Sequence, residues 1–129
     1  LLICVSTDIG GYIFGKIFKG PKLTKISPKK TYSGVIGGYL LSIIFLKLFL
    51  SSNFFFIKPI EISPDIFIFI LLISTVSQLG DIIISYFKRL SKIKDTGKII
   101  PGHGGLLDRV DGMIFAYPFA YLILKMNLF

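Results

Sequence analysis

Four long apolar stretches, separated by shorter polar segments, dominate the pattern of this chain. They cover residues 1–18, 34–50, 65–87 and 112–129. Each approaches or exceeds the roughly 17–25 apolar residues that a helix needs to cross the hydrocarbon core of a bilayer. A backbone in lipid must satisfy its own hydrogen bonds, so such spans are helical. The pattern predicts an all-α fold, a polytopic integral membrane helical bundle.

Composition and charge support the same class of protein. Hydrophobic residues make up 53% of the 129 residues, and the mean hydropathy is +0.76, above the values of ordinary soluble domains. The net charge is +8, but the lysines gather in two segments, 19–33 and 88–111, each beside an apolar stretch. This is the positive-inside pattern of cytoplasmic loops rather than a nucleic-acid-binding surface. The single cysteine, Cys4, excludes an internal disulfide and a cysteine-based metal site, and its apolar surroundings favour a small buried residue.

The first residues, LLICV, include no initiator methionine and no charged leader. We therefore expect the chain to be the C-terminal part of a longer protein.

Polar residues inside the apolar stretches are candidates for function. Asp8 lies within the first stretch, where a carboxylate costs roughly 2.5–3.5 kcal/mol on insertion scales. Asp8 is either functional, or it merely lies near the interface or pairs with a neighbouring lysine. A polar stripe at helical spacing runs along the third stretch and must face protein or water; it comprises Ser74, Gln78, Asp81 and Ser85. Gly11 and Gly15 form a small-xxx-small pair that permits close helix packing.

The segment from Ser85 to Asp111 concentrates the chemistry. Its lysines and arginines suit phosphates, its bare glycine backbone suits close approach of a ligand, and its aspartates suit Mg²⁺. Asp108 and Asp111 are three residues apart, so in a helix they project from one face and can share a cation. The segment predicts an active site.

These residues also resemble a known family. The spacing of polar residues is similar to the signature of phosphatidate cytidylyltransferases, the CDP-diacylglycerol synthases, and is carried by Ser85, Lys88, Arg89, Lys94, Asp95, His103, Gly104, Gly105, Asp108, Arg109 and Asp111. A second block, from Ser6-Thr7-Asp8 through Gly15-Lys16 to Ser27-Pro28-Lys29-Lys30-Thr31, resembles the same family upstream. Together they cover nearly the whole chain. The residues after the signature look like bacterial members, which implies a bacterial cytoplasmic membrane with the active site facing the cytoplasm.

The resemblance implies transfer of a cytidylyl group from CTP to phosphatidic acid, giving CDP-diacylglycerol and pyrophosphate. The catalytic residues that we predict are Asp81, Lys88, Arg89, Lys94, Asp95, His103, Asp108, Arg109 and Asp111. The predicted substrate- or phosphate-binding residues are Asp8, Ser27, Lys29, Lys30, Thr31, Ser85, Gly104 and Gly105. The metal ligands that we predict are Asp81, Asp108 and Asp111, for one or two divalent cations, Mg²⁺, with an additional monovalent cation allowed.

Several roles stay open at this point. His103 either donates to a phosphate, acts as an acid toward pyrophosphate, or satisfies backbone groups of the loop. Asp95 is either a metal ligand or a salt-bridge partner of a neighbouring cation. Asp81 is either a ligand or a hydrogen-bonding helix contact. The basic segment at 19–33 either sets topology or forms a wall of the phosphate site.

The expected partners are CTP, phosphatidic acid, membrane lipid and a second copy in a homodimer, without nucleic acid. Two other functions are compatible with the pattern. One is a CTP-dependent lipid or polyprenol kinase, and the other, from a different class, is part of a cation-binding transporter.

Overall fold

The computed structural model describes residues 1–24, 30–52, 63–92 and 107–126. These residues form four helices, α1 (Leu2–Phe18), α2 (Tyr32–Ser51), α3 (Pro64–Leu90) and α4 (Leu107–Lys125). Across the same ranges the remaining regular feature is an isolated antiparallel bridge between Lys22 and Thr31. The predicted all-α class is confirmed for the described part of the chain.

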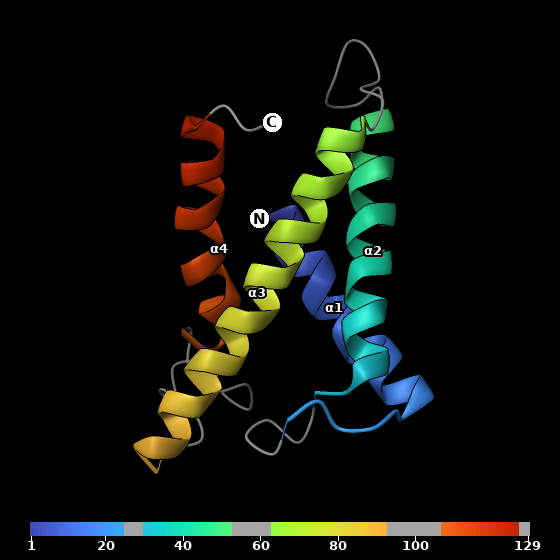
Figure 1. The fold of residues 1–129 in the computed structure, drawn as a ribbon. Coiled ribbons are helices and arrows are strands. Elements are labelled where there is room, and N and C mark those ends of the chain that lie inside the picture. Colours follow the sequence, from blue (N-terminus) through green and yellow to red (C-terminus); the bar gives the residue numbers. More distant parts are fainter. Residues whose placement is uncertain (25–29, 53–62, 93–106, 127–129) are drawn as a thin grey trace.

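The helices run alternately in opposite directions (Figure 1). As a result α1 and α3 end, and α2 and α4 begin, at the same end of the molecule. We call this the basic end, because the residues that follow α1 and those in the last turn of α3 include Lys19, Lys22, Lys30, Lys88 and Arg89. Both lysine-rich segments of the sequence thus leave their helices on one side.

Two helices extend further into the central segment than the sequence predicts. α3 continues to Leu90, so Lys88 and Arg89 belong to its last turn instead of a loop. α4 begins at Leu107 rather than at residue 112, and it therefore includes Asp108 and Asp111. The helix dipole accounts for both differences, because cations are favoured at a helix C-terminus and carboxylates near an N-terminus. The predicted loop at 88–111 is therefore corrected at its two ends, because residues 88–90 and 107–111 are helical.

Glycines bring α1 and α2 into backbone contact. A Cβ atom on Gly10 would overlap the carbonyl of Gly37, and one on Gly34 would lie 2.7 Å from the carbonyl oxygen of Gly11. Small residues at a helix interface allow this approach. The sequence predicted close packing at Gly11 and Gly15, and the Gly11 carbonyl does take part in this contact. Among the glycines of α1, Gly10 has the least room for a Cβ atom.

A chain of buried hydroxyl groups joins the first three helices. The Thr7 and Ser74 hydroxyls are hydrogen-bonded at 2.9 Å, and the Ser74 hydroxyl donates to that of Ser42 at 3.0 Å. All three side chains are almost fully buried. The polar stripe of α3 therefore faces protein at Ser74, as predicted, and fixes the third helix against the first two.

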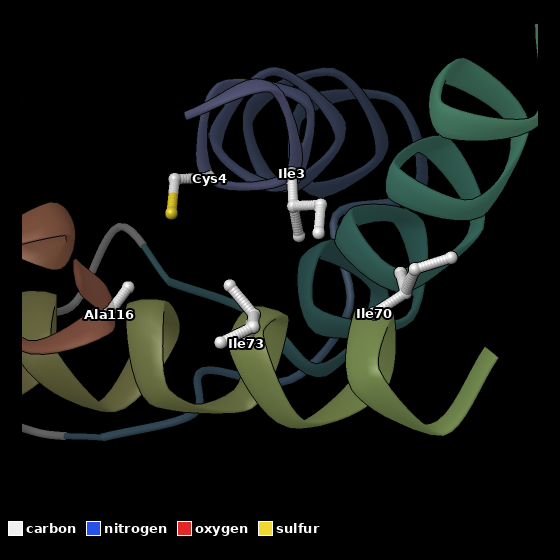
Figure 2. Close-up of a cluster of buried hydrophobic side chains, with 5 residues drawn as sticks. All are labelled: Ile3, Cys4, Ile70, Ile73 and Ala116. Atoms are coloured by element: carbon white, nitrogen blue, oxygen red, sulfur yellow. The ribbon is translucent and has the colours of Figure 1, made fainter. Parts of the chain in front are cut away.

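The buried apolar core is small and lies between α1, α3 and α4. Figure 2 shows its members, with Ile3 and Cys4 on α1, Ile70 and Ile73 on α3 and Ala116 on α4. Cys4 is a free, buried thiol, as its sequence context predicts. Many larger apolar side chains instead lie on the outer surface of the bundle. Among the described helices, α2 and α3 are long and apolar enough to cross a membrane.

Candidate active site

A cavity of about 310 Å³ opens between α1, α2 and α3. Its walls carry polar groups from segments far apart in the sequence, namely Thr7, Asp8, Tyr12, Lys30, Thr31, Gln78 and Asp81. Gly11, Gly34 and Val35 complete the lining. Four predicted site residues, Asp8, Lys30, Thr31 and Asp81, are thus brought together from three parts of the chain.

The backbone around Lys30 is held in place on both sides. The Leu23 amide donates to the Lys30 carbonyl at 2.8 Å, and the Tyr32 amide donates to the Pro21 carbonyl at 3.1 Å. Thr31 then caps α2, its hydroxyl accepting from the Gly34 amide at 3.1 Å. Ser, Thr, Asp and Asn are the usual residues at this position because they satisfy an unpaired amide of the first turn. The base of the Lys30 side chain is therefore fixed at the mouth of the cavity.

From this position Lys30 reaches across to α3. Its ammonium group lies 3.0 Å from Asp81 Oδ2 and donates to the Gln78 carbonyl at 3.3 Å. The two side chains are 27% and 22% exposed, so water still reaches the ion pair. The attraction between the two charges is less screened than in a pair on the surface, and the pair incurs less desolvation than one removed from water.

Asp8 adds a second carboxylate to the same cavity. It is exposed through the open side and interacts electrostatically with Asp81, Lys30 and Asp111. The cavity lining therefore brings two carboxylates and one ammonium group together. Two oxygen ligands that face one cavity favour a divalent cation there.

A second ion pair lies beside the cavity, between α3 and α4. Lys88 Nζ is 2.6 Å from Asp111 Oδ2, and the two side chains are only 13% and 8% exposed. The next residue, Gly112, packs directly on α3, where an added Cβ atom would lie 2.8 Å from Asp81 Oδ1. Asp81 and Asp111 are therefore presented on adjoining surfaces of the two helices.

The other predicted residues are placed as follows. On α3, Ser85 is half-buried and Arg89 is exposed, and neither lines the cavity. Asp108 and Arg109 lie in the first turn of α4, and their side chains are outside the description. The residues outside the described ranges are Ser27, Lys29, Lys94, Asp95, His103, Gly104 and Gly105. Of the three predicted metal ligands, the structure describes the side chains of Asp81 and Asp111. The described side chains include no cluster of three metal-binding groups.

Three lining residues, Thr7, Tyr12 and Gln78, have no predicted role in the site. Gln78 stands in the polar stripe three residues before Asp81, so helical spacing places it on the same face. Thr7 precedes Asp8 but points to Ser74, where it bonds helix to helix. Tyr12 follows Asp8 by one helical turn, a spacing that also indicates a shared face.

Comparison with known proteins gives a consistent result. The sequence matches the profile of the "Cytidylyltransferase family" over residues 1–127. The phosphatidate cytidylyltransferase of Rickettsia bellii (strain RML369-C) is 44% identical over 128 residues, covering 95% of this chain and 55% of that protein. The enzyme of the same name from Bacillus subtilis (strain 168) is 39% identical over 126 residues, covering 94% of this chain and 44% of that protein.

A third relative, the phosphatidate cytidylyltransferase of Brucella suis biovar 1 (strain 1330), is 40% identical over 121 residues, covering 91% of this chain and 42% of that protein. The chain thus spans about half the length of the curated relatives it matches. The resemblance seen in the signature residues is confirmed over nearly the whole sequence. With a profile match that leaves only the last two residues uncovered, the chain belongs to the cytidylyltransferase family.

Proposed function

We propose that this chain forms part of an enzyme that transfers a cytidylyl group from CTP to phosphatidic acid, giving CDP-diacylglycerol and pyrophosphate for phospholipid biosynthesis. The observation that carries the proposal is the cavity in which Lys30, Asp8 and Asp81 meet inside a largely apolar helical bundle. An ammonium group binds phosphate directly, and carboxylates bind it through a divalent cation. The names of the relatives supply the two substrates.

The proposal includes a membrane location, with the four helices as spans of a polytopic bundle. Supporting this, α2 exposes a line of large apolar side chains at helical spacing, Ile36, Leu40, Ile44 and Leu48. A line of this kind is unfavourable in water and favourable in lipid. The basic end would face the cytoplasm of a bacterium by the positive-inside rule. The homodimer that the family resemblance implies is part of the same proposal.

In this reaction the lipid phosphate is itself the nucleophile. One of its oxygens forms a bond to the α-phosphorus of CTP. The bond from that phosphorus to the oxygen bridging to the β-phosphate breaks, and pyrophosphate leaves with the electron pair. Since no protein nucleophile is needed, the side chains contribute positioning and charge stabilisation. Lys30 would hold a phosphate group, and Thr31 can donate its hydroxyl to a second phosphate oxygen.

The donors in the cavity fit Mg²⁺. This ion is usually held by one or two carboxylates together with waters and substrate phosphates, and Asp8 and Asp81 supply two carboxylates to a single cavity. Asp111 lies on the adjoining surface of α4, outside the cavity lining, where it pairs with Lys88. When bound, a divalent cation would screen the triphosphate and stabilise the leaving pyrophosphate. The proposal leaves room for a second divalent or an additional monovalent cation.

Cytidylyl transfer is tested with the full-length protein in detergent or liposomes. Radiolabelled CTP, phosphatidic acid and Mg²⁺ are supplied, and label entering the lipid phase is measured for the wild type and for Asp111→Asn. The control is Asp65→Asn, which alters an exposed acid about 24 Å from Asp81 along α3, at 1.5 Å per residue.

We expect lipid labelling in the wild type and the control, and loss of labelling in Asp111→Asn. If the wild type instead releases CDP and phosphorylates a lipid, the protein is a kinase. If neither product forms, cation binding without chemistry becomes the better explanation.

A further inference from the structure

The Lys30–Asp81 ion pair joins two groups whose chemistry suits different ligands. A lysine ammonium suits a phosphate, and an aspartate in a cavity suits a divalent cation. Here the two bind one another, with Lys30 Nζ 3.0 Å from Asp81 Oδ2. An ammonium at that distance occupies one lone-pair site of the carboxylate oxygen and repels a divalent cation that approaches the same oxygen.

We propose that Lys30 and a divalent cation are alternative partners of Asp81, and that arrival of the cation frees the lysine to bind a nucleotide phosphate. This inference rests on the proposed function for the identity of the nucleotide. It assigns to one lysine two successive partners, the carboxylate first and the phosphate second. Metal binding and phosphate binding then support one another. The cation that binds Asp81 releases Lys30 for the phosphate, and the phosphate that binds Lys30 releases Asp81 for the cation.

The geometry allows the exchange without movement of the backbone. The main chain of Lys30 is fixed by the Leu23 amide and by the Thr31 cap of α2. Its ammonium stands at the end of a flexible four-carbon stem. Rotation of that stem moves the charge within the cavity while the wall of the cavity stays in place.

The exposure of the pair also favours exchange. With 27% and 22% of the two side chains exposed, water can solvate each charge as the pair separates. The Lys88–Asp111 pair differs, since its side chains are only 13% and 8% exposed and both belong to packed helices. Breaking a buried pair of that kind is much more costly. The Lys30–Asp81 pair in the cavity is therefore exchangeable, whereas the Lys88–Asp111 pair beside the cavity is fixed.

The nearby carboxylate of Asp8 also favours the exchange. It lines the same cavity and interacts electrostatically with Asp81 and Lys30, so one lysine faces two acids there. A divalent cation that replaces the lysine at Asp81 neutralises more of this negative charge than the ammonium does.

The test measures metal binding directly. Full-length protein in detergent is titrated with Mn²⁺ in the absence of nucleotide, and free Mn²⁺ is followed by electron paramagnetic resonance. The wild type is compared with Lys30→Gln and with Lys22→Gln, a control that removes the same charge from an exposed lysine outside the cavity. Binding of a non-hydrolysable CTP analogue is then measured by calorimetry at saturating Mn²⁺.

We expect Lys30→Gln to bind Mn²⁺ about tenfold more tightly than the wild type, a change of about 1.4 kcal/mol. The same variant should bind the CTP analogue about tenfold more weakly, since it lacks a charge-assisted phosphate contact. Lys22→Gln should match the wild type in both titrations. Unchanged or weaker Mn²⁺ binding by folded Lys30→Gln overturns the inference.

A measurement on the wild type covers the case in which Lys30→Gln does not fold. Mn²⁺ should speed the modification of Lys30 by an amine-reactive reagent, detected by mass spectrometry, while Lys22 keeps its rate. An unchanged rate at Lys30 overturns the inference. These results are independent of cytidylyl transfer: tighter Mn²⁺ binding supports the exchange even in a protein without that activity, and unchanged binding refutes it even in an active one.

Discussion

Replacing Gly112 with alanine tests the helix contact that presents Asp81 and Asp111 together. A Cβ atom at residue 112 would lie 2.6 Å from Ser77 Oγ, 2.7 Å from the Ser77 carbonyl oxygen and 2.8 Å from Asp81 Oδ1. Ordinary contact begins at 3.4 Å, so the carbonyl is roughly 0.7 Å too close, and it belongs to a rigid helix. α4 must therefore move away from α3.

The expected effects on stability and on activity follow from that displacement. Overpacking costs about 1–3 kcal/mol, while replacing a helical glycine with alanine gains about 1 kcal/mol. Because the clash is with backbone, we expect a net loss of about 2 kcal/mol. A displacement approaching 1 Å at a catalytic site lowers the rate by about 100-fold. Thermal unfolding in detergent and the lipid-labelling assay measure the two effects.

Gly11→Ala is the matched control for stability. Its Cβ atom would meet only the Gly34 carbonyl oxygen, at 3.7 Å, which is an ordinary contact. We therefore expect this variant to be about 1 kcal/mol more stable than the wild type, through helix propensity alone. If Gly112→Ala unfolds at or above the wild-type temperature and keeps its activity, the close contact between α3 and α4 does not exist as described.

Three further substitutions test other contacts. Asp81→Asn should abolish cytidylyl transfer while the protein remains inserted and folded, because the amide is a poor ligand for a cation. Ser74→Ala removes the middle hydroxyl of the buried chain and leaves Ser42 without its donor, so it should lower stability by about 1–3 kcal/mol in thermal unfolding. Lys88→Met removes the ammonium from the buried Asp111 carboxylate and should cost about 3–5 kcal/mol.

A specific experimental outcome would contradict each of these three predictions. Activity of Asp81→Asn within a few-fold of the wild type rules out a metal-binding role for that carboxylate. Equal stability of wild type and Ser74→Ala would mean that the hydroxyl chain contributes nothing. For Lys88, the double variant Lys88→Met with Asp111→Asn should recover part of the loss, and no recovery would show that the cost is not electrostatic.

The helices were predictable because apolar runs of this length leave few alternatives. The ends of the helices were harder to predict. α3 extends through Lys88 and Arg89, and α4 begins before Asp108. Charged residues at these positions fit a loop, but they also fit a helix terminus whose dipole they complement, so the sequence alone does not distinguish the two. The close contact of α1 with α2 was predicted at Gly11, whereas the α1 glycine with the least room for a Cβ atom is Gly10. The register of this contact depends on where the partner helix places its own glycines, which spacing within one helix does not reveal.

The chemistry of the candidate site was readable from residue types, but its pairing was not. Asp8, Lys30 and Asp81 were each identified as functional candidates, the lysine for phosphate and Asp81 for metal. Their sequence positions give no sign that Lys30 and Asp81, 51 residues apart, form an ion pair. That contact depends on the Thr31 cap, which fixes the lysine at the start of α2, and on the hydroxyl chain through Ser74, which sets α3 at the right height. A site built from three helices is therefore specified largely by uncharged residues that touch no substrate, and these are the residues whose roles a motif does not disclose.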